Sequence, residues 1–368
     1  MELSEPEKLA LANGVLTIDI GAVVANYRTL VAQVAPARCA GVVKADCYGL
    51  GAAKIAPALW QAGCRDFFVA LIGEGLALRD ILGPEARIYV LNGLPPGAEN
   101  AAVAAQLIPV LNSLAQCRAW ASTGLPAVLQ VDSGMSRMGL SVADQKALLA
   151  DEALFGSLDL VLLMSHLANA DEPDHGGNFS QHADFLAASS LFQNLPLSLA
   201  NSAGSFHGDS FHLDLCRPGA VLYGIEAGPR VSGIKPVVSL QGRVGQLRDI
   251  PAGASIGYGY QFTADKPMRL ATISVGYADG WPRSLSNRGA AWFEGQRLPI
   301  VGRVSMDSFV VDAGTTPGLA EGNLVELIGP NQSADQVARD AGTIGYEVLT
   351  NLGRRYHRIY NFSAGGAS

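Results

Sequence analysis

The chain has 368 residues, of which 49% are hydrophobic and 16% are charged, with a formal net charge of −7. Its length suits two domains, or one large barrel with an appended domain. The acidic balance, without any block rich in Lys or Arg, argues against nucleic acid as a partner. Residues 1–8 are acidic and precede no long apolar segment, which predicts no signal peptide, no membrane span and a cytoplasmic location.

Apolar runs bounded by turn residues alternate with helix-like stretches through the first two thirds of the chain. A strand at 16–20 and a helix at 19–34 come first. Eight further strands are predicted at 39–44, 67–71, 87–91, 107–111, 127–131, 158–164, 197–200 and 213–216, with helices between most of them, as at 52–62, 113–122 and 141–150. This alternation predicts βα units with parallel strands. Eight strands suit a (β/α)8 barrel better than an open sheet, which periodicity alone does not exclude.

After Pro236 the apolar runs become short and are mostly separated by Gly, Pro or Asp. Strands are expected at 237–244, 268–275, 298–304, 308–311 and 324–328, without clear amphipathic helices between them. The sequence therefore predicts a barrel domain over 14–236 and a mostly β domain over 237–362, with the strand at 16–20 available to pair with the β domain. Residues 1–13 and 363–368 are expected to be flexible ends. The five cysteines include no CxxC pair, which indicates buried thiols rather than disulfides or a zinc site.

Polar residues follow the barrel strands at the ends where barrels carry their functional loops. Lys44 and Tyr48 follow the first strand, and the loop that contains Arg137 follows the fifth. The sixth strand is followed by Ser165 and His166, the seventh by Asn201, Ser202, Ala203 and Gly204, and the eighth by Arg217, Pro218, Gly219 and Ala220. Barrels often bind phosphate with the loops after strands seven and eight, where a hydroxyl and backbone N–H groups are available here.

Lys44 ends an apolar run, so its amine is expected where the buried strand opens into a loop. Desolvation favours a neutral amine, and a neutral lysine can form a Schiff base with a substrate or with pyridoxal phosphate. Taken singly, such a lysine is more often solvated, His166 is more often a core histidine, and Arg137 and Arg217 are more often surface groups. A phosphate site at one end and a lysine at the other favour a pyridoxal phosphate site.

Five segments in this order resemble the alanine racemases, pyridoxal phosphate enzymes built from a barrel and a β domain. The resemblance extends from about residue 16 to residue 360. The segments are VKADCYG at 43–49, DSGMSRMG at 132–139, RPGAVLYG at 217–224, VGYADGW at 275–281 and VGRVSMD at 301–307. The resemblance implies an isomerase that interconverts L-alanine and D-alanine.

The resemblance also implies a role for each matching residue. Lys44 would bind the cofactor as a Schiff base and act as the base on one face of the substrate, whereas Tyr277 would act on the opposite face with His166 as its hydrogen-bonded partner. A free tyrosine, with a pKa of about 10, is a poor base at neutral pH and needs such a neighbour. Arg137 would contact the phenolic oxygen of the cofactor and the substrate carboxylate, and Arg217 the pyridine nitrogen. The remaining cofactor contacts would come from Tyr48, Asn201, Ser202, Gly219 and Ala220.

A homodimer with shared active sites is implied as well, because in such enzymes the β domain of one subunit covers the barrel mouth of the other. Tyr277 and the substrate-binding residues Met306 and Asp307 would come from the partner, with the Met306 backbone N–H near the substrate carboxylate. Tyr258, Asp171 and Arg303 would line the entrance, and no metal is implied. Whether the enzyme supplies D-alanine for peptidoglycan precursors or degrades it stays open.

The sequence departs from many relatives at two positions. Where they carry a lysine, modified to a carbamate that orients the following arginine, this chain has Gln130, so Arg137 needs another support such as a neutral amide or an anion. Where they carry a tyrosine that reaches the phosphate, this chain has Arg354, and Tyr356 is a possible substitute. Neither role is carried over.

Three alternatives are weighed against an alanine racemase. A racemase of broader specificity, for serine or a basic amino acid, differs only by small changes around the entrance. A decarboxylase of related architecture needs an acidic partner for the pyridine nitrogen, and Arg217 argues against one. A non-catalytic pyridoxal phosphate carrier lacks a β domain, so the long segment after Pro236 favours the enzyme.

Overall fold

The computed structural model describes residues 4–192 and 194–362. The chain consists of two compact units, of which one contains Val23–Lys235 and the other combines Met1–Ala22 with Pro236–Ser368. We call the first the barrel unit and the second the β unit. None of the helices in the described ranges is long and apolar enough to cross a membrane.

Eight parallel strands form a closed ring in the barrel unit. Seven of them pair in sequence order, namely β3 (Gly41–Val42), β4 (Asp66–Val69), β5 (Arg87–Val90), β6 (Ile108–Leu111), β7 (Pro126–Gln130), β8 (Asp159–Met164) and β9 (Leu197–Ser198). The ring closes through β10 (Leu215–Cys216), which pairs with β2 (Arg38–Cys39) just before β3. The N–H of Arg217 donates to the Ala200 carbonyl at 2.9 Å and so joins β10 to the segment that continues β9. The predicted (β/α)8 barrel is confirmed, and the open sheet is excluded.

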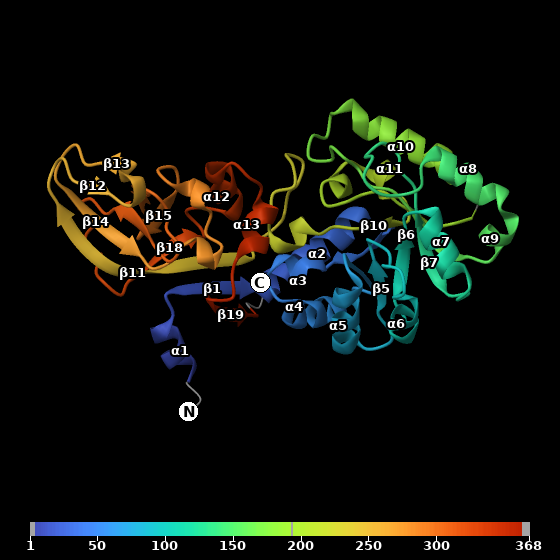
Figure 1. Cartoon of the computed structure of the whole chain (residues 1–368), viewed down its shortest axis with the longest axis horizontal. Helices are drawn as coiled ribbons and strands as arrows, with labels where there is room; N and C mark the ends of the chain where they lie inside the picture. The colour runs from blue at the N-terminus through green and yellow to red at the C-terminus, as the bar shows by residue number, and fades with distance from the viewer. Residues whose placement is uncertain (1–3, 193, 363–368) are drawn as a thin grey trace. The chain divides into compact units, whose positions relative to one another are not determined.

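Helices follow most of these strands and cover the outside of the ring (Figure 1). They are α2 (Ile20–Val34), α3 (Lys44–Tyr48), α4 (Ala52–Gln61), α5 (Ile72–Leu82), α6 (Glu99–Ala104), α7 (Leu114–Ala121), α8 (Val142–Ala150), α9 (Glu152–Gly156), α10 (Gly176–Ser189) and α11 (Asp209–His212), with the 3-10 turns η1 (Gly204–Phe206) and η2 (Ala220–Tyr223). The helices predicted at 52–62, 113–122 and 141–150 are observed as α4, α7 and α8. Ser113 and Ser141 cap α7 and α8 by accepting a backbone N–H three residues later, which sets where these helices begin.

The strands are buried on both faces, as expected of a parallel ring covered by helices. Phe67, Phe68 and Val69 of β4 are all at most 1% exposed. Since all the strands run in the same direction, their carboxyl ends meet at one edge of the ring. The loops that carry the predicted functional residues of the barrel unit start from this edge.

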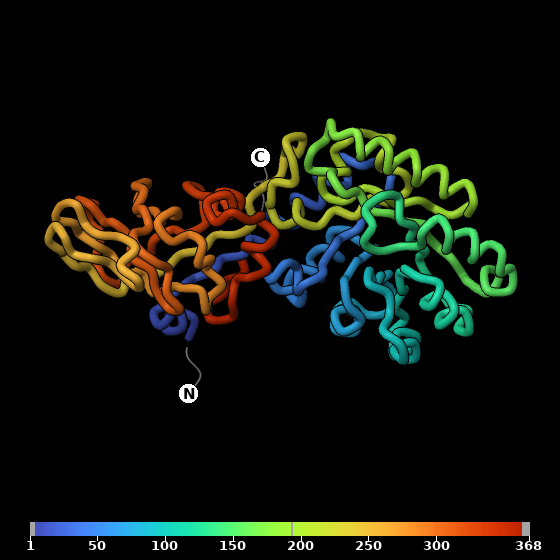
Figure 2. The backbone as a smooth tube through the Cα atoms, turned by 45° about the horizontal axis from the view of Figure 1, so that its top comes forward, coloured from blue at the N-terminus to red at the C-terminus, as the bar shows by residue number. Residues whose placement is uncertain are grey.

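The β unit is built on one mixed sheet to which the N-terminal strand β1 (Gly14–Asp19) contributes, next to the edge strand. β1 pairs antiparallel with β11 (Val238–Ile250) and parallel with β19 (His357–Asn361), so strands from the first and the last part of the chain lie side by side (Figures 1 and 2). The other strands are β14 (Met268–Ile273), β15 (Ala290–Phe293), β16 (Gln296–Pro299), β17 (Phe309–Asp312) and β18 (Leu324–Ile328), with a separate hairpin of β12 (Ser255–Ile256) and β13 (Phe262–Thr263).

Three short turns of the β unit are η3 (Tyr258–Tyr260), η4 (Tyr277–Asp279) and η5 (Arg283–Leu285). Two of the predicted functional residues lie in them, Tyr258 in η3 and Tyr277 in η4. The unit also contains helices in segments where none was predicted. α1 (Glu5–Leu11) lies in the segment predicted to be a flexible end, and α12 (Ala334–Ala341) and α13 (Gly345–Asn351) interrupt the expected succession of strands.

These differences have local causes. α1 has a capping box, in which the Glu7 carboxylate accepts the N–H and the hydroxyl of Ser4, and a proline in its first turn. α12 begins at a capping residue, Ser333, and its buried face consists mainly of small side chains, which a search for large apolar residues passes over. Residues 363–368, also predicted to be flexible, lie outside the described residues.

Candidate active site

Lys44 stands at the carboxyl end of β3, immediately before an unusual backbone segment. Ala45, Asp46, Cys47 and Tyr48 all adopt left-handed helical angles, with φ between 52° and 56°. Burial lowers the pKa of the Lys44 amine, nearby Arg137 lowers it further, and Glu74 opposes the change. The lysine is therefore held near an aqueous edge in a site that favours the neutral, nucleophilic amine.

Three groups converge at the loops that follow β9 and β10. The N–H of Gly219 donates to Ser202 Oγ at 2.9 Å, which leaves the Ser202 hydroxyl proton available for a ligand. A Cβ atom added to Gly219 would lie 2.3 Å from the Tyr48 hydroxyl oxygen, so the tyrosine hydroxyl lies directly against this glycine. The ring of Tyr48 packs on Tyr223 with 4.9 Å between the centroids. The turn at Asn201 is closed by its side-chain oxygen, which accepts the N–H of Gly204 at 3.0 Å.

Arg217 is a buried cation, only 4% exposed, at the start of this last loop. Its Nη2 donates to the Ser165 carbonyl at 2.6 Å, and its Nη1 donates to Ser198 Oγ. Within the described ranges no carboxylate forms an ion pair with it. Burial lowers the pKa of its guanidinium to about 10, so the group stays charged at neutral pH. A buried charge without a counterion is costly, which indicates a group kept for a ligand.

His166 shares this environment and is neutral. Desolvation lowers its pKa to about 3, and the positive charges of Arg217, Arg137 and Lys44 act in the same direction. Its backbone is fixed by Gln181 of α10, whose Nε2 donates to the His166 carbonyl at 3.0 Å and whose Oε1 accepts the N–H of Ala168 at 2.8 Å. A neutral imidazole can accept a hydrogen bond from an approaching hydroxyl.

The loop that carries Arg137 is organised by one carboxylate. Oδ1 of Asp132 accepts the backbone N–H groups of Gly134, Met135 and Ser136 at 2.9 to 3.1 Å. Arg137 itself is exposed, so its guanidinium is available to an anion at the barrel edge. Asp171, predicted to line the entrance, follows β8 in a stretch where the neighbouring Ala170 carbonyl is 2.7 Å from His207 Nε2.

In the β unit, Tyr277 begins the turn η4, which is tied to the loop of Met306 and Asp307. The N–H of Tyr277 donates to the Ser305 carbonyl at 3.0 Å. Arg355 joins the two segments, since it contacts both carboxylate oxygens of Asp279, at 2.6 and 2.9 Å, and Asp307 at 2.7 Å. This clamp holds the predicted substrate-binding residues and Tyr277 in one cluster.

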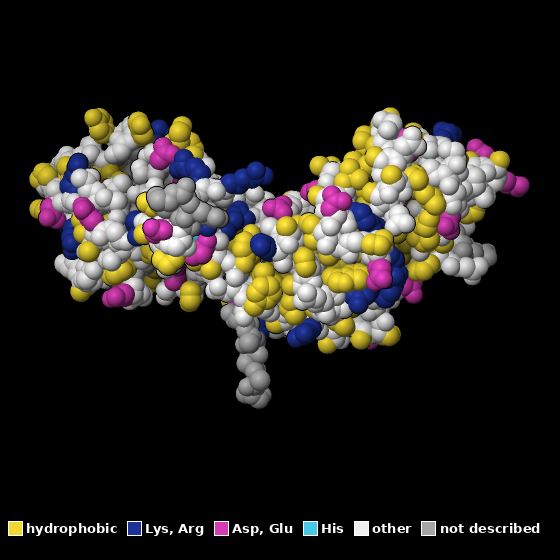
Figure 3. All heavy atoms as spheres, turned by 90° about the horizontal axis from the view of Figure 1, so that it is seen from below, with side chains coloured by type: hydrophobic (Ala, Val, Ile, Leu, Met, Phe, Trp, Pro, Cys, Tyr) yellow, Lys and Arg dark blue, Asp and Glu magenta, His cyan; other side chains and the backbone are white. Residues whose placement is uncertain are grey.

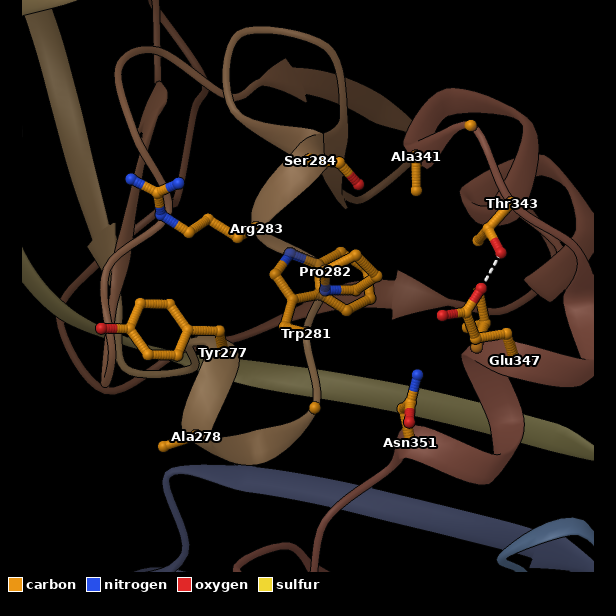
Figure 4. Close-up of a pocket in the computed structure, with 13 residues that line it drawn as sticks. Tyr277, Ala278, Trp281, Pro282, Arg283, Ser284, Ala341, Thr343, Glu347 and Asn351 are labelled. Carbon is orange, nitrogen blue, oxygen red and sulfur yellow. Dashed lines mark hydrogen bonds between the residues drawn. The ribbon is translucent and has the colours of Figure 1, made fainter.

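A cavity of about 600 Å³ adjoins Tyr277 within the β unit. In Figure 4, Tyr277 and Arg283 extend on one side of Trp281 and Pro282. Thr343, Glu347 and Asn351 lie on the other side. The phenol of Tyr277 thus points away from the Glu347 carboxylate.

Tyr258, in the turn η3, is more exposed than Tyr277. It is 72% exposed, whereas Tyr277 is 42% exposed. A Cβ atom added to the next residue, Gly259, would lie 3.4 Å from Nη1 of Arg303, so this guanidinium lies beside η3. Tyr258, Tyr260 and Met306 are the exposed apolar side chains that distinguish these loops.

Figure 3 shows basic and acidic side chains interspersed with apolar ones over the visible face. Among the described residues no group of three or more His, Cys, Asp or Glu side chains could hold a metal ion. The five cysteines are free and buried, as predicted.

The family models match both parts of the chain. The model described as the N-terminal domain of alanine racemase matches residues 18–227, and the model of the C-terminal domain matches residues 237–360. The chain belongs to the alanine racemase family. The predicted resemblance is therefore confirmed.

Individual alanine racemases are similar to it over nearly their whole length. A relative from Mesorhizobium japonicum, named a catabolic alanine racemase, is 54% identical, and the match covers 96% of this chain and 95% of the relative. The crystal structure of alanine racemase from Bartonella henselae with covalently bound pyridoxal phosphate is 46% identical with a TM-score of 0.92, and the match covers 95% of this chain and 100% of that one. The biosynthetic alanine racemase from Pseudomonas aeruginosa is 35% identical with a TM-score of 0.89 and the same coverage.

The two departures from the alanine racemase pattern have visible surroundings. Gln130 is buried, and its Nε2 lies 3.3 Å from the Met138 carbonyl, so the amide supports the end of the Arg137 loop from within. Arg354 is exposed. Tyr356 is buried against Gly14 inside the β unit, which does not suit a contact with a phosphate.

Sequence reasoning missed the residues that hold the site in place. Glu74, Gln181, Ser198 and Arg355 all bond to functional segments from positions far along the chain. Glu74 and Gln181 lie on helices, where a polar residue carries no local sign of its partner. Low exposure distinguishes some of them, but exposure cannot be read from a single sequence.

Proposed function

We propose that the chain interconverts L-alanine and D-alanine with pyridoxal phosphate as cofactor. One observation carries this proposal. At a single edge of the barrel, Lys44 has a lowered pKa, Tyr48, Ser202 and Gly219 converge, and the buried Arg217 has no carboxylate partner among the described residues. Membership in the alanine racemase family supports the assignment of reaction and cofactor.

The residues present fit this cofactor. The Ser202 hydroxyl, the Tyr48 hydroxyl and the N–H groups after Gly219 would hold its phosphate, in a cradle that a side chain at position 219 would fill. Lys44 would bind it covalently. When bound, the cofactor withdraws electrons from the α-carbon of the amino acid and makes its proton acidic.

The side chains of this chain would then manage charge and protons. Lys44, with its lowered pKa, accepts a proton on one face of the substrate. Arg137 binds the substrate carboxylate. Arg217, still charged at neutral pH, would disfavour protonation of the cofactor's ring nitrogen, so that this nitrogen would stay neutral.

A second proton-transfer group must act on the opposite face, and two tyrosines of the β unit are candidates. The resemblance favours Tyr277. The greater exposure of Tyr258 supports this residue as the stronger candidate, because a group that acts in the site of another subunit must project from the surface of its own subunit. The guanidinium of Arg303 lies beside the turn η3 that carries Tyr258. Neutral His166 of the other subunit would accept the hydrogen bond from this phenol.

We also propose a homodimer in which the β unit of each subunit completes the barrel site of the other. The exposed side chains of Tyr258, Tyr260 and Met306 support this arrangement, since exposed large side chains of this kind are available for a protein contact. Five free cysteines support a reducing compartment, the cytoplasm. If the active site is shared, the specific racemase activity falls on dilution as the dimer dissociates. A specific activity that stays unchanged far below the dimer dissociation constant contradicts a shared site.

The tyrosine assignment is tested by two matched variants, Tyr258→Phe and Tyr277→Phe. In deuterated water, loss of the second proton-transfer group slows α-proton exchange from one enantiomer of alanine far more than from the other. We expect this asymmetry in Tyr258→Phe and a smaller, even loss in Tyr277→Phe. The reverse result assigns the role to Tyr277, and equal losses for both enantiomers in both variants contradict a two-base reaction.

The specificity is tested separately. Measuring kcat/KM over alanine, serine and basic amino acids distinguishes an alanine racemase from one of broader specificity. Cofactor binding without any α-proton release from alanine would support a non-catalytic carrier instead.

A further inference from the structure

The segment after Lys44 requires support from outside itself. Left-handed helical angles cost a residue with a side chain roughly 1–2 kcal/mol each, and here four such residues follow one another. Glycine is not used at any of the four positions. The strain is therefore concentrated at the residues that set the direction of the Lys44 side chain, and neighbouring groups have to hold it.

Glu74 supplies such support from the first turn of α5. Its Oε1 accepts the N–H of Ala45, the residue after Lys44, at 2.7 Å. Its Oε2 accepts the N–H groups of Ala70 and Leu71 at 2.7 and 3.1 Å. One carboxylate thus links the loop after β3 to the loop after β4. Hydrogen bonds to an ionised acceptor are about twice as strong as neutral ones.

Glu74 is also the carboxylate that acts on the Lys44 amine. The charged groups that influence this amine are Arg137, which opposes its protonation, and Glu74, which favours it. Neutral His166 lies in the same environment. The Glu74 carboxylate therefore has two connections to the same lysine, one through the backbone and one through charge.

We infer that Glu74 is a positioning residue for Lys44, whose carboxylate fixes the left-handed turn through the Ala45 N–H and counters the positive charge around the lysine amine. This inference rests on the role proposed above for Lys44. Helix capping alone does not explain the arrangement, because a capping glutamate needs only the N–H groups at its own helix end.

The test compares Glu74→Gln and Glu74→Ala with a matched control, Asp144→Asn. Asp144 occupies the same capping position in α8, where its carboxylate accepts the N–H and hydroxyl of Ser141. The pH dependence of Lys44 acetylation by trace acetic anhydride, followed by peptide mass spectrometry in the full-length protein freed of cofactor, reports the amine. Amide hydrogen exchange of the peptide that contains Ala45 reports the turn.

We expect Glu74→Gln to lower the pKa of Lys44 by about half a unit or more, because a negative neighbour is lost. Glu74→Ala should show the same shift and about tenfold faster exchange at Ala45. Asp144→Asn should change neither quantity. An unchanged lysine pKa in both Glu74 variants, or equal shifts in the control, overturns the inference.

The failure of the proposed function has a different signature. Borohydride reduction after adding pyridoxal phosphate, followed by peptide mapping, shows which lysine takes the cofactor. If the label is not on Lys44, the proposed function is wrong even where the exchange data support the link between Glu74 and Ala45. If Lys44 is labelled and the Glu74 variants behave like the unmodified protein, only the positioning role fails.

Discussion

Gly219→Ala should weaken cofactor binding by direct steric conflict. The added methyl group would lie 2.3 Å from the Tyr48 hydroxyl oxygen, 3.1 Å from Tyr48 Cζ and 3.3 Å from Val42 Cβ. Tyr48 cannot easily turn away, because its ring packs on Tyr223. Forcing a methyl group into such a packed place typically costs about 1–3 kcal/mol. If this cost falls on the bound state, the Kd for pyridoxal phosphate rises about 5- to 150-fold.

The assay is a spectroscopic titration of the cofactor-free protein with pyridoxal phosphate, together with thermal unfolding before the cofactor is added. Gly156→Ala is the control, since a Cβ atom at Gly156 meets nothing within 4 Å. Because Tyr48→Phe removes the hydroxyl that the added methyl group would meet, Gly219→Ala should raise the Kd less in the Tyr48→Phe background than in the unmodified protein. A Kd for Gly219→Ala equal to that of the unmodified protein would refute the cradle.

Three further predictions concern the surrounding residues. Gln181→Leu removes the bonds to the backbone around His166 and should lower kcat more than Gln145→Leu, which alters a similarly buried glutamine of α8; equal losses in a racemase assay argue against positioning. His166 has a folded pKa of about 3, below its unfolded value, so the unfolded state binds more protons and stability falls as the pH falls from about 6.5; chemical denaturation should show about 2 kcal/mol lost by pH 5, and less in His166→Gln. Arg355→Met breaks the contacts with Asp279 and Asp307 and should lower racemase activity through the β-unit loops while cofactor binding by the barrel unit persists; unchanged kcat and KM contradict this role.

The barrel was predictable because its signal is local and repeated. Each buried strand between turn residues shows itself in a few consecutive residues, as at Phe67 and Phe68, and eight such runs suffice for the class of fold. The β unit was predictable only in outline. The pairing of β1 with β19 joins segments more than 300 residues apart, and α12 has a buried face of mostly small side chains, so neither leaves a strong local pattern.

In the candidate site, too, only the features with a local sequence pattern were predictable. Lys44, His166 and Arg217 could be proposed from the sequence because each follows a strand at the functional end of the barrel. Their charge states could not, since the low pKa of His166 depends first on its burial and then on three cations contributed by three other loops. The choice between Tyr258 and Tyr277 also required the exposed fraction of each side chain, which depends on the folded structure.

The left-handed turn after Lys44 explains why the sequence could predict the lysine but not the backbone conformation around it. Ala45, Asp46 and Cys47 have no marked preference for positive φ in common, and alanine and cysteine side chains disfavour it. The conformation persists because Glu74, 29 residues further along the chain, binds the N–H of Ala45, while the Asp46 carboxylate accepts the N–H of Ala52 at the start of α4. The lysine proposed to react could thus be predicted from its local sequence, whereas the backbone geometry around it depends on a helix that follows the next strand.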